Sequence, residues 1–272
     1  MTLADACDDL RAEARALRTL LDGRPGFDPH DVTPFFGWRV RDTVAHLAFI
    51  DRLALLTLTD PAAFAGELAQ FAQGTAGAAR GGAAVFARLT AYEHSRLSHL
   101  DWDGLLSAWD AGRDALIAAA GRCAEDAKVK WFGPDMRLAS LLNARQMEVW
   151  AYGQDVFDLY RAERVEADRL RNVAEFAVRT FGFSFANRGL AVPEQRPYVA
   201  LTAPSSVVWT WNAVGASSTI AGSAVDFCRV ATQRRHAADT GLEVRGDAAQ
   251  TWMRIAQCIA GPPLDGPAQG SR

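Results

Sequence analysis

The sequence predicts an α+β protein, in which an N-terminal bundle of four or five helices precedes a small C-terminal domain of strands and helices. Apolar residues recur at helical spacing through most of the first 188 residues. After Pro197 the pattern changes to short segments of β-branched and aromatic residues, which is typical of strands. The chain has 272 residues, of which 49% are hydrophobic, so it can bury two cores. We expect domains at residues 1–188 and 198–260, followed by a loose tail at 261–272.

Five segments of the N-terminal region have the spacing of amphipathic helices. Their ends carry ordinary cap and stop residues: Thr2 precedes the first helix, Asp101 or Asp103 caps the third, and Gly189 follows the fifth. Residues 60–99 are rich in alanine and glycine, which indicates broken helices and a mobile segment there. The expected long helices cover residues 2–22, 40–58, 105–117, 138–164 and 166–187.

The C-terminal region reads as strands joined by turns, with two helices. Two of the strands bracket a turn at Ala203-Pro-Ser-Ser206. The tail from Gly261 is rich in proline and glycine and has too little apolar surface to offset the entropic cost of ordering. The expected strands are 198–202, 206–211, 218–220 and 242–245, and the expected helices are 223–232 and 247–259.

Composition and charge argue against several functional classes. A formal net charge of −3 and a pI near 6.0, with no basic stripe interleaved with aromatics, argue against nucleic acid as a partner. Charged residues interrupt every apolar run before it is long enough to span a membrane, and the N-terminus lacks the pattern of a secretion signal. We therefore expect a soluble, cytoplasmic protein. The cysteines have no metal-binding or redox spacing, so we expect buried free thiols at Cys7, Cys123, Cys228 and Cys258.

Polar residues on two predicted helices form the candidate site. Glu148, Tyr152 and Asp155 are spaced at i, i+4 and i+7, so they share one helical face. His46 lies within another, mostly apolar helix, where a bare imidazole needs a partner. Helical bundles build metal sites from such a pair on one helix and a ligand on another. Glutamate and histidine are ordinary zinc ligands, whereas neutral tyrosine is a weak one.

Four segments carry a resemblance to a known family. They are Trp38-Arg-Val-Arg-Asp-Thr-Val-Ala-His-Leu47, Trp131-Phe-Gly-Pro-Asp-Met136, Ala144-Arg-Gln-Met-Glu-Val-Trp-Ala-Tyr-Gly-Gln-Asp155 and Asp226-Phe-Cys-Arg-Val-Ala-Thr-Gln-Arg-Arg-His236. Together they resemble the mycothiol-dependent maleylpyruvate isomerase group of the DinB superfamily, and most of all an actinobacterial subgroup described as metal-binding. The resemblance extends over almost the whole chain.

The resemblance implies a DinB-like bundle that holds a divalent metal, zinc or nickel, through histidine, glutamate and histidine, and then a small domain similar to sterol carrier proteins. His46 and Glu148 stand at the first two ligand positions, and Tyr152 stands where the family has the second histidine. Near relatives are also expected to have a histidine in place of Asn172 or Glu175. Because one of the three ligands is exchanged, we expect weak metal binding at this remodelled site.

The resemblance implies the activity of a small-molecule isomerase or thiol transferase that uses mycothiol. We expect this activity to belong to specialised metabolism. The expected pocket lies between the bundle and the C-terminal domain, where an arginine binds an anionic group of the thiol or the substrate. His46, Glu148 and Tyr152 are the expected catalytic residues. The expected substrate-binding residues are Trp38, Trp131, Trp150, Asp155, Arg234 and Arg235.

Other interpretations of these residues stay open. Without a metal, burial would raise the carboxyl pKa of Glu148, while the imidazole of His46 and the phenol of Tyr152 would pass protons in an isomerisation, cyclisation or elimination. Alternatively, the chain binds and sequesters a hydrophobic metabolite without catalysis. In a purely structural role, His46 is a core histidine hydrogen-bonded to a carboxylate, Glu148 pairs with Arg145, and Tyr152 is a packing aromatic. His94 and His99 are expected on a solvated helical face, together with their neighbour Glu93.

Overall fold

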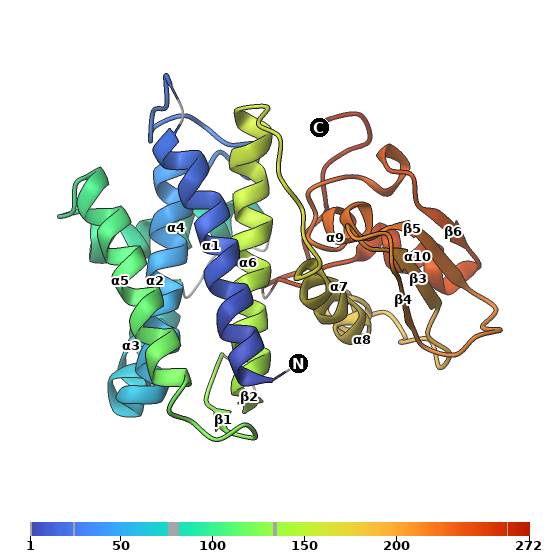
Figure 1. Ribbon diagram of the computed structural model, residues 1–272, viewed down its shortest axis with the longest axis horizontal. Coiled ribbons are helices and arrows are strands. Elements are labelled where there is room, and N and C mark those ends of the chain that lie inside the picture. Colours follow the sequence, from blue (N-terminus) through green and yellow to red (C-terminus); the bar gives the residue numbers. More distant parts are fainter. Residues whose placement is uncertain (1, 24, 76–81, 133–134, 260) are drawn as a thin grey trace. The chain divides into compact units, whose positions relative to one another are not determined.

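The computed structural model describes residues 2–23, 25–75, 82–132, 135–259 and 261–272 (Figure 1). The chain divides into two compact units, the first ending at Ala162 and the second beginning at Glu163. The first unit is helical apart from a short hairpin, and the second combines helices with a sheet. This architecture confirms the predicted α+β class.

Four long helices of the first unit form a closed ring of contacts. Around the ring, α1 packs on α6, α6 on α2, α2 on α5, and α5 on α1. Two further helices, α3 and α4, pack on α2, which makes α2 the central helix of the unit. Their bounds are α1 (Leu3–Gly23), α2 (Val40–Thr59), α3 (Pro61–Thr75), α4 (Gly82–Leu97), α5 (Trp102–Ala120) and α6 (Leu138–Leu159).

Apolar residues and caps explain the central helices. Val44, Leu47 and Leu53 of α2 are completely buried, as expected for a helix with neighbours on several sides. The carboxylate of Asp42 caps the start of α2 by accepting the backbone N–H of Arg39 at 2.8 Å. At α5, Asp101 is the N-cap, since its carboxylate accepts the backbone N–H of Gly104 at 2.8 Å. The cap therefore falls on the first of the two aspartates considered from the sequence.

The alanine- and glycine-rich segment 60–99 contains two ordered helices. α3 and α4 fill most of it as two separate helices, in agreement with the broken helices that the sequence indicated. Part of the segment 60–99 in which the sequence predicts mobility, residues 76–81, lies outside the described residues. A two-stranded hairpin of β1 (Lys128–Val129) and β2 (Met136–Arg137) then leads into α6. Within the described residues, no helix has both the length and the apolar composition needed to cross a bilayer.

The second unit contains a four-stranded sheet in the order β4-β3-β5-β6. β3 runs parallel to β5, whereas the β3–β4 and β5–β6 pairs are antiparallel. Helix α9 packs on β3 and β5, and α10 packs on β6. The strands are β3 (Tyr198–Thr202), β4 (Val208–Trp211), β5 (Thr219–Ser223) and β6 (Glu243–Arg245); the helices are α7 (Leu170–Arg179), α8 (Phe181–Ala186), α9 (Ala224–Ala231), the 3-10 turn Ala237–Asp239 and α10 (Asp247–Ile255).

The unit boundary differs from the one expected at residue 188. α7 packs on α9 and α8 packs on α10, so both belong to the second unit. The ring of Phe181 meets that of Trp252 at 5.1 Å, which places the start of α8 in the core of that unit. The single helix expected at 166–187 is also divided: α7 ends at Arg179, and the C-cap residue Thr180, whose hydroxyl donates to the carbonyl of Phe176 at 2.9 Å, separates it from α8.

The C-terminal tail, expected to be loose, is held by hydrogen bonds to buried side chains. Leu264 is buried, and its backbone N–H donates to the side-chain oxygen of Gln257 at 2.9 Å. Its carbonyl accepts the side-chain N–H of Gln233 at 2.7 Å. Arg188 also donates to that carbonyl. Because the bonds from Gln233 and Arg188 come from residues 31 and 76 positions away in sequence, no periodic pattern in the tail predicts them.

Leu264→Ala tests whether this anchor stabilises the second unit. Removing a buried leucine side chain is expected to lower the free energy of unfolding by about 2–3 kcal/mol. Leu190→Ala is the control, because Leu190 belongs to the same unit and is 44% exposed. Urea unfolding of both variants measures the difference. Equal midpoints for the two variants would show that the tail is not anchored at Leu264.

Candidate functional site

A chain of buried polar side chains crosses the first unit. It connects α4, α2, α6 and α5 through five successive contacts between oppositely charged or hydrogen-bonded groups. Its members, in order, are Glu93, His46, Glu148, Arg145, Asp51 and Trp109. Buried polar groups are costly unless they are paired, so such a continuous arrangement is a specific product of the fold.

His46 lies between two carboxylates from different helices. Its Nδ1 is 2.7 Å from Oε1 of Glu93 on α4, at hydrogen-bonding distance. Its Nε2 is 3.3 Å from Oε2 of Glu148 on α6, close enough for an ion pair. That second contact lacks hydrogen-bond geometry, so the buried Nε2 has no hydrogen-bond partner among the described residues. The imidazole is therefore fixed from one side and still has a donor position to satisfy on the other.

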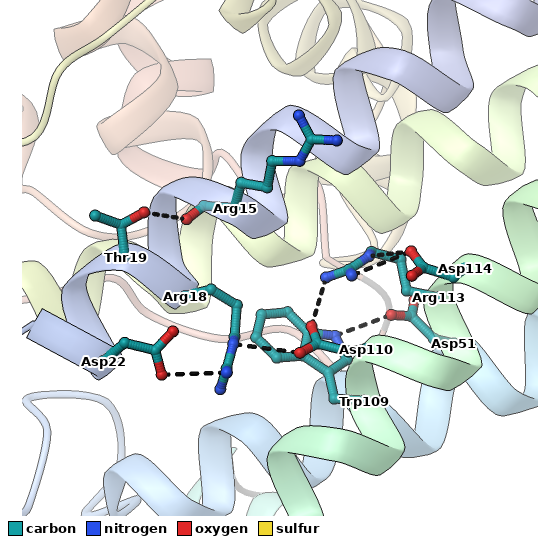
Figure 2. A network of polar contacts seen from close by, with 9 residues as sticks. All are labelled: Arg15, Arg18, Thr19, Asp22, Asp51, Trp109, Asp110, Arg113 and Asp114. Carbon is teal, nitrogen blue, oxygen red and sulfur yellow. Dashed lines mark hydrogen bonds and ion pairs between the residues drawn. The ribbon is translucent and has the colours of Figure 1, made fainter.

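Arg145 and Asp51 form the fully buried part of the chain. Nε of Arg145 donates to Oδ1 of Asp51 at 2.8 Å, and Nη1 of Arg145 donates to Glu148. The other oxygen of Asp51 accepts the indole N–H of Trp109 at 3.0 Å. Figure 2 shows Trp109 reaching Asp51 from α5, beside the contact of Arg18 on α1 with Asp110 on α5, at 3.3 Å. Polar contacts thus join α5 to both α2 and α1.

The charges along this chain shift the pKa values of its members. Burial acts to lower the pKa of His46, but the charge of Glu93 and the contact with Glu148 outweigh it and raise the pKa to about 9. Burial acts to raise the pKa of Glu148, but the charges of Arg145 and His46 lower it to about 2. The expectation of a raised carboxyl pKa at Glu148 was therefore wrong, because two cations lie beside this carboxylate. Burial raises the pKa of Glu93 and Asp51.

Tyr152 contributes an aromatic wall beside His46. Its ring meets the imidazole edge to face, with centroids 4.9 Å apart. It also stacks on Trp38 at 5.4 Å, and Trp38 lies 5.2 Å from His46. The structure thus brings together the three residues expected to be catalytic, with Trp38 next to them. These ring contacts of Tyr152 fit the packing role considered from the sequence.

The other residues expected to bind substrate are placed in three different surroundings. Trp150 and Asp155 are buried side chains of α6. Trp131 stacks on Phe64 at 5.8 Å, in an apolar cluster with residues of α2 and α3. Arg234 and Arg235 belong to the second unit, where Arg235 donates to the carbonyl of Arg234 at 2.8 Å. A substrate-binding role for these five residues stays a prediction.

Two residues of the site were missed by the sequence analysis. Glu93 was grouped with the solvated face of its helix, and Asp51 was given no role. The signal for Glu93 was present: together with Phe86 and Leu97 it is spaced at i, i+7 and i+11, so it shares their apolar face. His94, the next residue, is half-exposed as expected, yet its Nε2 lies 2.6 Å from Oδ1 of Asp42.

The residues at the implied ligand positions do not fit a metal ion. Within the described ranges, no three histidine, cysteine, aspartate or glutamate side chains are grouped so that they could hold one. Glu148 accepts a hydrogen bond from the cationic guanidinium of Arg145, and Nδ1 of His46 is engaged by Glu93. The third position, Tyr152, offers a phenol that packs among aromatic rings. Arg145 therefore supplies the positive charge next to Glu148.

Comparisons with known proteins agree with this architecture. The family model described as the mycothiol maleylpyruvate isomerase N-terminal domain matches residues 10–157. Two uncharacterized proteins of Mycobacterium tuberculosis, from strains CDC 1551 and H37Rv, are each 36% identical to the chain over 255 residues, which cover 94% of this chain and 95% of each relative. The alignments therefore include both compact units.

Two solved structures share the fold. One is a crystal structure of a histidine-to-alanine mutant of the mycothiol-dependent maleylpyruvate isomerase, with a TM-score of 0.54 and 17% identity over 90% of this chain and 93% of that chain. The other is a crystal structure of the mycothiol-dependent maleylpyruvate isomerase, with a TM-score of 0.52 and 18% identity over 86% of this chain and 90% of that chain. At these identities the likeness concerns the fold.

Asp51→Asn tests the buried ion pair. Removing this charge leaves the fully buried guanidinium of Arg145 with only one of its two carboxylate partners, Glu148, so the free energy of unfolding is expected to fall by about 3 kcal/mol. Glu243→Gln is the matched control, because it removes a carboxylate from the exposed Arg245–Glu243 pair at 2.8 Å. That change is expected to cost less than about 1 kcal/mol. If urea unfolding gives the same small loss for both, the Arg145–Asp51 pair does not stabilise the fold.

The raised pKa of His46 predicts that the folded protein loses stability at alkaline pH. Its folded-state pKa of about 9 lies above the ordinary 6.5, so its contribution is fully present below pH 6.5 and is lost as the pH rises toward 9. The free energy of unfolding of the native protein should fall across this window more steeply than that of His46→Gln. His94→Gln retains His46 and should keep the native slope. If the free energy of unfolding falls with pH equally steeply in the native protein and in His46→Gln, the pKa of His46 is not raised in the folded state.

Proposed function

The chain belongs to the mycothiol maleylpyruvate isomerase family, and from this premise we propose that it is a small-molecule enzyme that isomerises, or adds a thiol to, an unsaturated organic acid at the His46–Glu148 pair. Mycothiol is the proposed thiol cosubstrate. The proposal assigns the acid–base chemistry to the protein's own side chains, because the residues at the implied ligand positions do not fit a metal ion.

The observation that carries the proposal is the unsatisfied donor of His46. Nε2 is buried and lacks a hydrogen-bond acceptor among the described residues. A buried N–H without a well-directed acceptor costs about 1–3 kcal/mol, so a hydrogen-bond-accepting oxygen of a ligand would be favoured beside it. The neighbouring Glu148 side chain is 18% exposed, compared with 6% or less for His46, Glu93, Arg145 and Asp51. A ligand would therefore meet this chain of charges at Glu148 and His46.

The charge states of the two groups suggest separate roles. With a pKa of about 9, His46 carries its proton at neutral pH and can donate it from Nε2 to an oxygen that gains negative charge during the reaction. With a pKa of about 2, Glu148 remains ionised and is a weak base, so its role is to hold the imidazolium and accept hydrogen bonds from substrate. Bound mycothiol would react as its thiolate, with the thiol proton released to water: the sulfur would add to one carbon of the double bond, and the π electrons would move to the conjugated carbonyl oxygen, which takes the proton of His46. Rotation about the new single bond and reversal of these transfers would give the isomer and return the thiolate and the imidazolium.

Tyr152 has a positioning role in this proposal. Its ring packs against the imidazole of His46 on one side and against the indole of Trp38 on another. These contacts restrict rotation of the imidazole and exclude water from its face. A reacting imidazole benefits from both effects, since electrostatic stabilisation is larger where water is excluded.

His46→Gln tests the proposed chemistry. Purified protein is assayed with maleylpyruvate and mycothiol as the probe substrates, and the product is followed by absorbance and mass spectrometry. Loss of the general acid is expected to lower kcat by roughly 100-fold or more. His94→Gln is the matched control, because His94 is also paired with a carboxylate on the α2–α4 helix pair but is half-exposed. Its kcat should be unchanged.

The alternative, sequestration without catalysis, predicts a different result in the same experiment. A sequestering protein would bind a probe, as measured by calorimetry, with no turnover in the native protein. Equal turnover in the native protein and in His46→Gln would also overturn the proposed mechanism. Absence of both turnover and binding with maleylpyruvate and mycothiol would remove these two molecules as substrate and cosubstrate.

A further inference from the structure

Glu93 is a buried carboxylate that the proposed chemistry does not use. Its side chain is 1% exposed, and it comes from α4, whereas the proposed reacting groups lie on α2 and α6. Burying a carboxylate is costly unless it is paired and hydrogen-bonded. The hydrogen bond from His46 Nδ1 to Oε1 of Glu93, at 2.7 Å, provides that pairing. The position of Glu93 is therefore tied to that of one imidazole nitrogen.

The two carboxylates next to His46 are not equivalent. Glu93 makes the shorter contact, with hydrogen-bond geometry, and is almost completely buried. Glu148 is 3.3 Å from Nε2, lacks that geometry and is partly exposed. An imidazole ring has two nitrogens on different edges, so a partner fixed at Nδ1 decides which way Nε2 points. Glu93 thus holds the ring, and Glu148 lies at the end of the ring where a ligand would bind.

A second histidine–carboxylate pair joins the same two helices and provides a contrast. There the carboxylate, Asp42, lies on α2 and the histidine, His94, lies on α4, with 2.6 Å between Oδ1 and Nε2. His94 is 42% exposed, and Asp42 also caps its own helix. This outer pair is enough to connect α2 with α4 near the start of α2. The pair His46–Glu93 adds a second contact between the two helices. This contact is buried, and it is made by His46, the proposed reacting group.

We propose that Glu93 is a positioning residue for His46: its carboxylate accepts the hydrogen on Nδ1 and so fixes the ring with Nε2 facing Glu148 and the substrate. The effect of this positioning on catalysis rests on the proposed function. The orientation of the imidazole ring itself does not depend on any substrate. Carboxylate–histidine pairs of this kind keep an imidazole in one protonation pattern and one orientation during acid–base catalysis. Glu93 itself makes no contact with substrate in this assignment.

The test uses the full-length chain with histidine labelled with nitrogen-15. In the native protein, the Nδ1–H of His46 should be a persistent, downfield-shifted resonance, because a buried carboxylate accepts it. In Glu93→Gln this resonance should be lost or move strongly upfield. Asp42→Asn is the matched control, since it alters the carboxylate of the outer pair and leaves Glu93 in place. The His46 resonance in Asp42→Asn should match the native one.

The kinetic readout separates positioning from a purely structural role. With maleylpyruvate and mycothiol, Glu93→Gln should lower kcat by roughly 10-fold or more, since the proton donor is held less well, while KM changes by less than about 3-fold. Asp42→Asn should keep the native kcat. If Glu93→Gln does not fold, Glu93→Asp replaces it: the retained but withdrawn carboxylate should give an intermediate resonance position and an intermediate kcat.

Failure of this proposal can be distinguished from failure of the proposed function. An unchanged Nδ1–H resonance in Glu93→Gln would overturn the positioning role, whether or not any turnover is found. A lost resonance together with native kcat would also overturn it, because the orientation of His46 would then have no effect on the reaction. A lost resonance in a protein without turnover of the probes would leave Glu93 as the residue that orients His46 and would count against the proposed function alone.

Discussion

The buried ion pair between Arg145 and Asp51 organises the interior of the helical unit. It joins α6 to α2, and Trp109 satisfies the second carboxylate oxygen from α5. A buried ion pair gains little net stability over apolar packing, because both charges lose their hydration. Its effect here is positional: the same guanidinium donates to Glu148 and so keeps a carboxylate ionised inside the bundle. The candidate site depends on that fixed negative charge.

Charges of opposite sign alternate along the whole chain of contacts. The order is carboxylate, imidazolium, carboxylate, guanidinium and carboxylate, so each cation lies between two anions. Alternation lets five ionisable side chains share a low-dielectric interior, where like charges in contact would be strongly repelled. It also explains why His46 holds its proton more tightly and Glu148 holds its proton less tightly than in water. One electrostatic arrangement thus sets the state of both proposed reacting groups.

The sequence predicted the residues with a strong local pattern. His46, Glu148 and Tyr152 stand out because polar side chains occur at helical spacing in apolar segments, and the structure places them together. The two structural roles considered for His46 and Glu148 are present as well, since His46 is bonded to a carboxylate and Glu148 to Arg145. A structural contact and a chemical role are therefore compatible at these positions.

Other features could not be predicted from local patterns. The spacing of Glu93 with apolar residues of α4 indicates that it is buried, but its pairing with His46 is not a local feature, because the two residues are 47 positions apart in sequence. The division between α7 and α8 and the anchoring of Leu264 depend on hydrogen bonds to distant or irregular segments. The lowered pKa of Glu148 depends on where two cationic side chains point, which spacing alone does not specify.

A double-mutant cycle between Glu93→Gln and Asp51→Asn tests most directly whether these side chains act as one network. The two residues lie at opposite ends of the chain of charges and are joined through His46, Glu148 and Arg145. The free energies of unfolding of the native protein, both single variants and the double variant are measured in urea. We expect a coupling free energy above about 0.5 kcal/mol, because each change alters charges that the other depends on. If the stability losses of the two single variants add up to the loss of the double variant within about 0.3 kcal/mol, the two ends are independent, which would contradict a shared network.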